Sequence, residues 1–84
     1  MTEAEAKIMA EHVAYWTALA QSGTVVVFGP VADPNGVWGV AIVEAEDEAA
    51  VGALTSRDPV MRAEIGARYE VLPMPRAVIG KKRQ

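Results

Sequence analysis

The chain contains no cysteine, which excludes disulfides, thiolate nucleophiles and thiolate metal sites. It has a single histidine, so a zinc site would need mostly carboxylate ligands, and we predict no metal. Nucleophilic serine signatures, phosphate-cradling glycine loops and cofactor fingerprints are also missing, so no cofactor is predicted. No apolar run approaches the roughly 20 residues of a membrane span, and no signal-peptide pattern is present. We therefore expect a cytoplasmic protein without a membrane partner.

The charge balance is slightly acidic. The 8 Lys and Arg against 11 Asp and Glu give a net charge of -3, which argues against nucleic acid as a partner. The only basic cluster, Lys81 to Arg83, is interpreted as a solvated tail. A single domain of 84 residues builds a limited core, and its 51% hydrophobic content is supplied mostly by Ala and Val. This composition favours a compact domain that associates through an apolar face.

The first predicted element is a helix over about residues 3–22. Thr2 followed by Glu5 has the spacing of a capping box, and Gly23 stands where a left-handed residue ends a helix. The helical period is carried by Ile8, Met9, Val13, Trp16, Leu19 and Ala20.

His12 falls near the centre of this apolar stripe, so its ring is expected to point inward or into a pocket. An unpaired buried polar group costs roughly 1–3 kcal/mol, so the ring needs a partner. Two interpretations stay open: a core histidine bonded to a backbone carbonyl or hydroxyl, and one half of a functional pair.

A β-hairpin is predicted next. Residues 24–28 are β-branched and aromatic, as expected of a strand covered on both faces, and Gly29 and Pro30 are expected to end it. The turn is Asp33-Pro34-Asn35-Gly36, and the strand returns over 37–43. Gly39 interrupts the return strand, which indicates a bulge or the close approach of a neighbour or ligand.

A second helix is predicted to begin at the acidic residues 46–48 and to end at Asp58-Pro59. Asp58 is suited to cap a further short helical turn with Pro59 at its first position, and it is also the best-placed acid to pair with His12. The two roles are compatible, because one carboxylate has two oxygens.

The alternation in residues 67–72, with Tyr69 and Val71 on one side, predicts a half-buried strand. Residues 76–80 are either a short further strand or part of a tail over 76–84. The order helix, strand, strand, helix, strand indicates an α+β domain with an antiparallel sheet and its helices on one face.

Over about residues 8–75 the chain resembles the YCII-related, or YciI-like, family. The resemblance is carried in order by His12, Gly29-Pro30, Asp33 to Gly36, Gly39 and Asp58-Pro59. It implies a domain over 1–75, a ferredoxin-like fold that dimerises into an α+β barrel, and therefore a homodimer. It also implies that His12 and Asp58 line a pocket as an active-site pair. One member type of the family dehydrochlorinates a chlorinated hydroxyquinol, whereas most members have no established reaction.

One family element appears absent: the strand that precedes the first helix has no room before Thr2. Its loss would leave unpaired backbone groups in the sheet. Three remedies are conceivable: the tail around Val78-Ile79 fills the gap, a partner chain supplies a strand, or the remaining strands close up.

The predicted function follows from the pair. Asp58 accepts a hydrogen bond from one ring nitrogen of His12, so the other nitrogen can exchange protons near neutral pH in an elimination or hydrolysis of a small molecule. The alternative is a module that binds a small molecule or dimerises without catalysis. Residues predicted to contact the substrate are Gly29, Pro30, Gly39 and the walls Trp16 and Trp38, although these tryptophans, like Phe28, also suit core packing.

Overall fold

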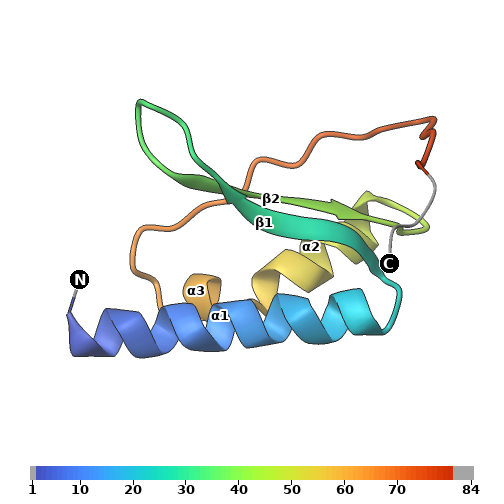
Figure 1. Cartoon of the computed structure of the whole chain (residues 1–84). Helices are drawn as coiled ribbons and strands as arrows, with labels where there is room; N and C mark the ends of the chain where they lie inside the picture. Colours follow the sequence, from blue (N-terminus) through green and yellow to red (C-terminus); the bar gives the residue numbers. More distant parts are fainter. Residues whose placement is uncertain (1, 81–84) are drawn as a thin grey trace.

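The structure, a computed structural model, describes residues 2–80. It is an α+β domain whose elements are, in order, α1 (Glu3–Gln21), β1 (Val25–Val31), β2 (Trp38–Val43), α2 (Glu48–Ser56) and α3 (Pro59–Arg62). β1 and β2 pair antiparallel in a two-stranded sheet. The helices lie on one side of this sheet and the C-terminal segment crosses the other side (Figure 1). The predicted α+β class with an antiparallel sheet is therefore confirmed.

α1 begins with the predicted capping box. The backbone N–H of Glu5 donates to Thr2 Oγ1 over 3.1 Å, and the backbone N–H of Thr2 donates to Glu5 Oε1 over 3.0 Å. Ser22 is the C-cap, and Gly23 follows with φ +91°, in the left-handed region that glycine tolerates best. The helix therefore starts at the predicted residue and ends one residue earlier than predicted.

β1 is longer than predicted, because Gly29 and Pro30 lie inside the strand rather than ending it. Pro30 is compatible with β1 because this strand has only one neighbouring strand, and proline in sheets occurs mainly on such edge strands. The hairpin turn is as predicted: the N–H of Gly36 donates to the carbonyl of Asp33 over 3.0 Å.

Of the two interpretations of Gly39, a bulge or a close approach, the bulge is not observed. Gly39 pairs with Pro30, and the register irregularity lies in β1 between Val25 and Val27. A Cβ at Gly39 would lie 3.9 Å from the carbonyl oxygen of Gly29, an ordinary contact. No close approach of backbone therefore requires glycine at this position.

The core lies between α1 and one face of the sheet, where Trp16, Val25 and Val60 are 1%, 3% and 8% exposed. The prediction that β1 is covered on both faces is wrong, because Val26 and Val27 are 41% and 52% exposed. The uninterrupted run of β-branched residues indicates a strand but does not specify how many layers cover it.

The strand predicted over 67–72 is also wrong, because the chain is irregular throughout 65–80. A strand needs a hydrogen-bonding neighbour, and the sheet described contains only β1 and β2. Val78 and Ile79 are 102% and 61% exposed and lie in irregular chain, so they do not form a strand in place of the absent family strand. A strand supplied by a partner chain stays a prediction.

The basic cluster Lys81 to Arg83 lies outside the described residues. Within residues 2–80, none of the helices has both the length and the apolar content that crossing a bilayer requires.

Candidate acid–base site

His12 and Asp58, 46 residues apart in the chain, form a hydrogen-bonded pair. Nδ1 of His12 lies 2.7 Å from Oδ2 and 2.8 Å from Oδ1 of the carboxylate. The side chain of Asp58 is 0% exposed, whereas that of His12 is 14% exposed. The structure thus brings together the two residues that sequence reasoning paired, with the carboxylate behind the ring.

Asp58 is held in place by the start of α3. It is the N-cap of this helix, Pro59 occupies the first helical position, and Oδ1 accepts the backbone N–H of Val60 over 3.0 Å. The predicted capping role is therefore confirmed, and it coexists with the contact to His12. The local sequence Asp-Pro fixes the carboxylate by ordinary helix-capping chemistry.

Trp16 contributes a second donor from α1. It lies one helical turn after His12, so both side chains project from the same face toward Asp58. Its Nε1–H donates to Oδ2 over 2.6 Å, and its ring stacks on Phe28 with centroids 5.7 Å apart and planes at 9°. Trp16 is thus a core residue, as one of its two interpretations had it, and also a hydrogen-bond partner of the site.

Tyr69 is the residue that sequence reasoning missed. Its hydroxyl donates to Asp58 Oδ2 and accepts the Nε1–H of Trp16 over 3.1 Å. The alternation with Arg68 and Glu70 indicated that this ring points inward. Nothing in the sequence indicated that it reaches a carboxylate, because that contact depends on the path of an irregular segment.

The network keeps the carboxylate ionised. Burial raises the pKa of Asp58, but the hydrogen bonds that it accepts lower this pKa by more than burial raises it. The donors are Tyr69, Trp16, Val60 and His12, and the net pKa lies below the usual value. Burial and the hydrogen bond to Asp58 raise the pKa of Tyr69 well above that of a free phenol. At neutral pH the site therefore holds one carboxylate anion and one neutral phenol.

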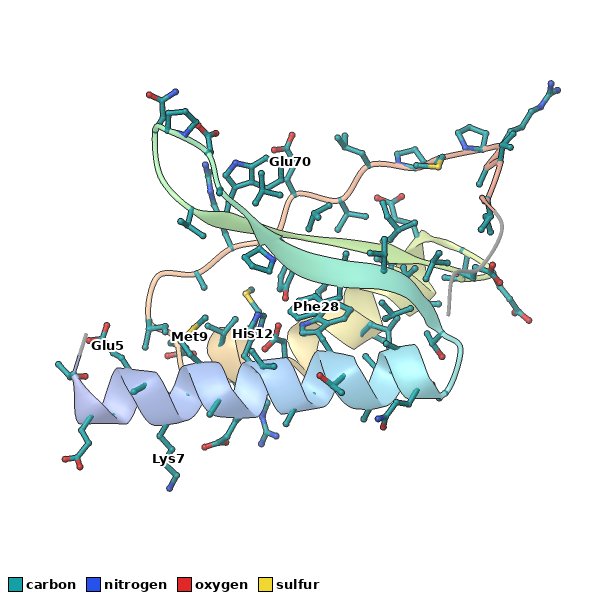
Figure 2. The ribbon with its side chains drawn as sticks, viewed as in Figure 1. Glu5, Lys7, Met9, His12, Phe28 and Glu70 are labelled. Atoms are coloured by element: carbon teal, nitrogen blue, oxygen red, sulfur yellow. The ribbon has the colours of Figure 1, made fainter. Side chains whose placement is uncertain are left out.

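The ring of His12 is left with one free nitrogen. An ionised carboxylate only accepts hydrogen bonds, so Nδ1 must donate and Nε2 carries the acceptor lone pair. Within residues 2–80, Nε2 has no hydrogen-bond partner. Phe28 meets the ring edge-on, with centroids 5.5 Å apart. Figure 2 shows His12 and Met9 projecting from α1 toward β1, with Lys7 pointing away.

The other predicted contact residues lie along the hairpin. Gly29 and Pro30 follow Phe28 in β1, and Gly39 pairs with Pro30 from β2. Trp38 is 51% exposed and donates its Nε1–H to Asp33 over 3.0 Å, and among the described residues no contact joins it to the His12 pair.

Comparison with models of known protein families shows to which family this chain belongs. The family model of the YCII-related domain matches residues 1–75. The chain belongs to the YCII-related family. No significant match is found among curated proteins or among solved structures. The family assignment inferred from the order of its motifs is therefore confirmed.

A surface hollow of about 340 Å³ adjoins the pair in this YCII-related domain. It lies along α1 and α3 and is lined by Ile8, Glu11, Pro59, Arg62 and Ala63. Ile8 is one turn before His12 and Pro59 directly follows Asp58, so the hollow is next to the pair, although the His12 ring does not line it. Within residues 2–80, no three His, Asp or Glu side chains are placed to hold a metal ion.

Proposed function

We propose that this YCII-related domain is an enzyme that carries out general acid–base chemistry on a small molecule. His12 Nε2 is the group that takes and returns the proton, and Asp58 positions the ring. One observation carries this proposal: Nδ1 bonds to a carboxylate that is 0% exposed, while the imidazole itself is 14% exposed. General acid–base catalysis uses this arrangement, in which a carboxylate fixes one ring nitrogen and the ring itself stays partly accessible.

Elimination and hydrolysis are two reactions whose proton transfers this group could carry out. In an elimination, Nε2 takes a proton from carbon, the released electron pair forms the double bond, and the leaving group departs with its own pair. In a hydrolysis, Nε2 takes a proton from water as the oxygen attacks, and then returns it to the leaving group. Asp58 stabilises the imidazolium formed in either case, because its charge lies directly against Nδ1–H.

An aromatic or otherwise apolar substrate suits the surroundings of the ring. Phe28 flanks His12, and β1, with the sequence Val-Val-Val-Phe-Gly-Pro-Val, brings no charged side chain to this side. We propose that the substrate lies along the hairpin beyond Phe28, where the predicted contacts are Gly29, Pro30, Gly39 and Trp38. Trp16 then backs the site from the core.

The test compares the wild-type protein with His12→Gln on a panel of halogenated hydroxyarenes and simple esters. Loss of general acid–base catalysis should lower turnover about 10²- to 10⁴-fold. Tyr15→Phe is the matched control, because Tyr15 also lies on α1 but bonds the carbonyl of Leu54 rather than Asp58. Turnover that survives His12→Gln would contradict the proposal. Saturable binding without turnover would instead support a non-catalytic binding module.

We also propose that the chain forms a homodimer of the α+β barrel type implied by its family. Support comes from apolar side chains on the side of the sheet away from α1: Val26 and Val40 are 41% and 37% exposed, and Leu72 and Met74 of the C-terminal segment are 77% and 59% exposed. Burial of this surface would add to a small core. Sedimentation equilibrium tests the proposal, and a monomer at tens of micromolar protein contradicts it.

A further inference from the structure

The carboxylate of Asp58 has no free acceptor position. Oδ2 faces Nδ1 of His12, Nε1 of Trp16 and the hydroxyl of Tyr69, and Oδ1 faces Nδ1 and the backbone N–H of Val60. A carboxylate offers about four lone-pair sites, and four donor groups occupy them. Asp58 therefore acts through the groups around it rather than on a substrate, and each donor takes a share of its charge.

Tyr69 stands apart from the other donors because of where it comes from. Between residues 62 and 80 every side chain is exposed except that of Tyr69. Among the described residues, its hydroxyl makes the only hydrogen bonds that join 65–80 to the rest of the chain. An aromatic ring that only anchored the segment by packing would not need its hydroxyl on a buried carboxylate.

The direction of its hydrogen bonds is fixed by its neighbours. An indole N–H only donates, so Trp16 fills a lone pair of the Tyr69 oxygen, and the phenol proton must point to Asp58. Tyr69 and His12 then compete for charge on the same oxygen, Oδ2. A stronger donor at position 69 weakens the bond from Nδ1, and a missing donor strengthens it.

We infer that Tyr69 is a positioning residue of this site, which acts through Asp58 Oδ2 to set the strength of the hydrogen bond that orients His12. The catalytic purpose of this positioning rests on the proposed function, but the hydrogen bond between His12 Nδ1 and Asp58 exists without substrate. Its test therefore needs no turnover.

The test is proton NMR of the imidazole Nδ1–H at a pH where the ring is neutral. His12 is the only histidine, so its signal is identified without further variants. Tyr69→Phe removes one donor from Oδ2, so the Nδ1–H signal should move downfield. Tyr15, like Tyr69, is half-buried, but its hydroxyl donates to the carbonyl of Leu54 rather than to Asp58. Tyr15→Phe should therefore leave the signal in place.

A second measurement keeps the inference testable if Tyr69→Phe does not fold. The chain has two tyrosines, so 3-fluorotyrosine incorporated into the Tyr15→Phe protein labels Tyr69 alone. This residue keeps the hydroxyl and makes it more acidic, hence a stronger donor, and the Nδ1–H signal should move upfield. An unchanged signal in folded Tyr69→Phe, or in the fluorinated protein, overturns the inference.

The two proposals fail in different ways. If no substrate is turned over but the Nδ1–H signal shifts in these opposite directions, Tyr69 positions His12 and only the enzymatic proposal fails. If turnover depends on His12 but the signal ignores Tyr69, only the positioning role fails. When both hold, Tyr69→Phe should lower kcat more than it raises KM, because the change alters the reacting ring rather than contacts to substrate.

Discussion

The indole N–H of Trp16 lies 2.6 Å from Oδ2 of Asp58, and both side chains are excluded from water, at 1% and 0% exposed. Hydrogen bonds to an ionised group are stronger than those between neutral groups, and no water can replace the indole in this place. The largest core residue and the charged group of the candidate site thus depend on each other. Changes to either should affect stability as well as the site.

Trp16→Phe should lower the free energy of unfolding by roughly 2 to 4 kcal/mol, because it removes both a donor to a buried charge and buried ring volume. Urea denaturation followed by circular dichroism measures the loss. Trp38→Phe is the matched control, since that ring is 51% exposed and bonds only the surface residue Asp33, and it should change stability by about 0.5 kcal/mol or less. Equal losses in the two variants would contradict a buried Trp16.

Asp58→Asn should destabilise the protein by roughly 2 to 4 kcal/mol at neutral pH. An asparagine can still cap α3 through its carbonyl oxygen, but its amide places N–H groups against the donors of Trp16 and Tyr69. The same denaturation experiment measures this. The change should also shift the Nδ1 signal of His12, because the ring loses its anionic acceptor.

Acid should remove the contribution of Asp58. Burial raises the pKa of this carboxyl, but its hydrogen bonds lower the pKa by more, so the folded-state pKa lies below that of the unfolded chain. The stabilisation is then present above the unfolded value of about 3.9 and is lost as the pH falls through the folded value. Unfolding free energies of wild type and Asp58→Asn between pH 7 and pH 2 should therefore converge at the acidic end.

Glu5→Gln is the control for this pH dependence. Hydrogen bonds with Thr2 also lower the pKa of Glu5, but this side chain is exposed at the start of α1. Its variant should therefore show a much weaker dependence on pH. A gap between wild type and Asp58→Asn that stays constant down to pH 2 would mean that Asp58 is not ionised in the folded protein.

Thr2→Ala should cost about 1 kcal/mol, because it removes the side-chain oxygen that accepts the Glu5 N–H at the start of α1. Faster hydrogen exchange at the Glu5 amide is the local readout. Thr17 lies at an exposed position within the same helix, and its hydroxyl bonds only the carbonyl of Val13. Thr17→Ala should therefore leave the exchange of the Glu5 amide unchanged. Equal exchange in Thr2→Ala and wild type would contradict the capping box.

The elements that sequence reasoning predicted well are those whose signals are local. The capping box at Thr2, the turn that ends at Gly36 and the cap at Asp58 each depend on residues within about one turn of each other. The pairing of His12 with Asp58 was predicted for another reason: a polar ring in an apolar stripe needs a partner, and the resemblance to the YCII-related family pointed to Asp58.

The failures concern non-local neighbours. Residues 67–72 have the alternation of a strand, but backbone pairing requires an adjacent strand, and sequence periodicity does not supply one. The same holds for β1, whose β-branched run stays 41% and 52% exposed at Val26 and Val27, because the segment that crosses the outer side of the sheet is irregular and covers β1 only in part (Figure 1). Tyr69 was expected to point inward, but no pattern in the sequence indicated that its hydroxyl bonds Asp58.

The sequence by itself determined the α+β class, the family, the caps at Thr2 and Asp58 and the hairpin turn, because each follows from side-chain chemistry and spacing along the chain. It also indicated, through the resemblance to the family, that His12 and Asp58 form a pair. Only the tertiary structure decided how the carboxylate of Asp58 is shared. Donors from α1, from the cap of α3 and from an irregular segment meet on its two oxygens. A buried charge must collect its hydrogen bonds from whichever donors the folded chain brings near, and that set exists only in three dimensions.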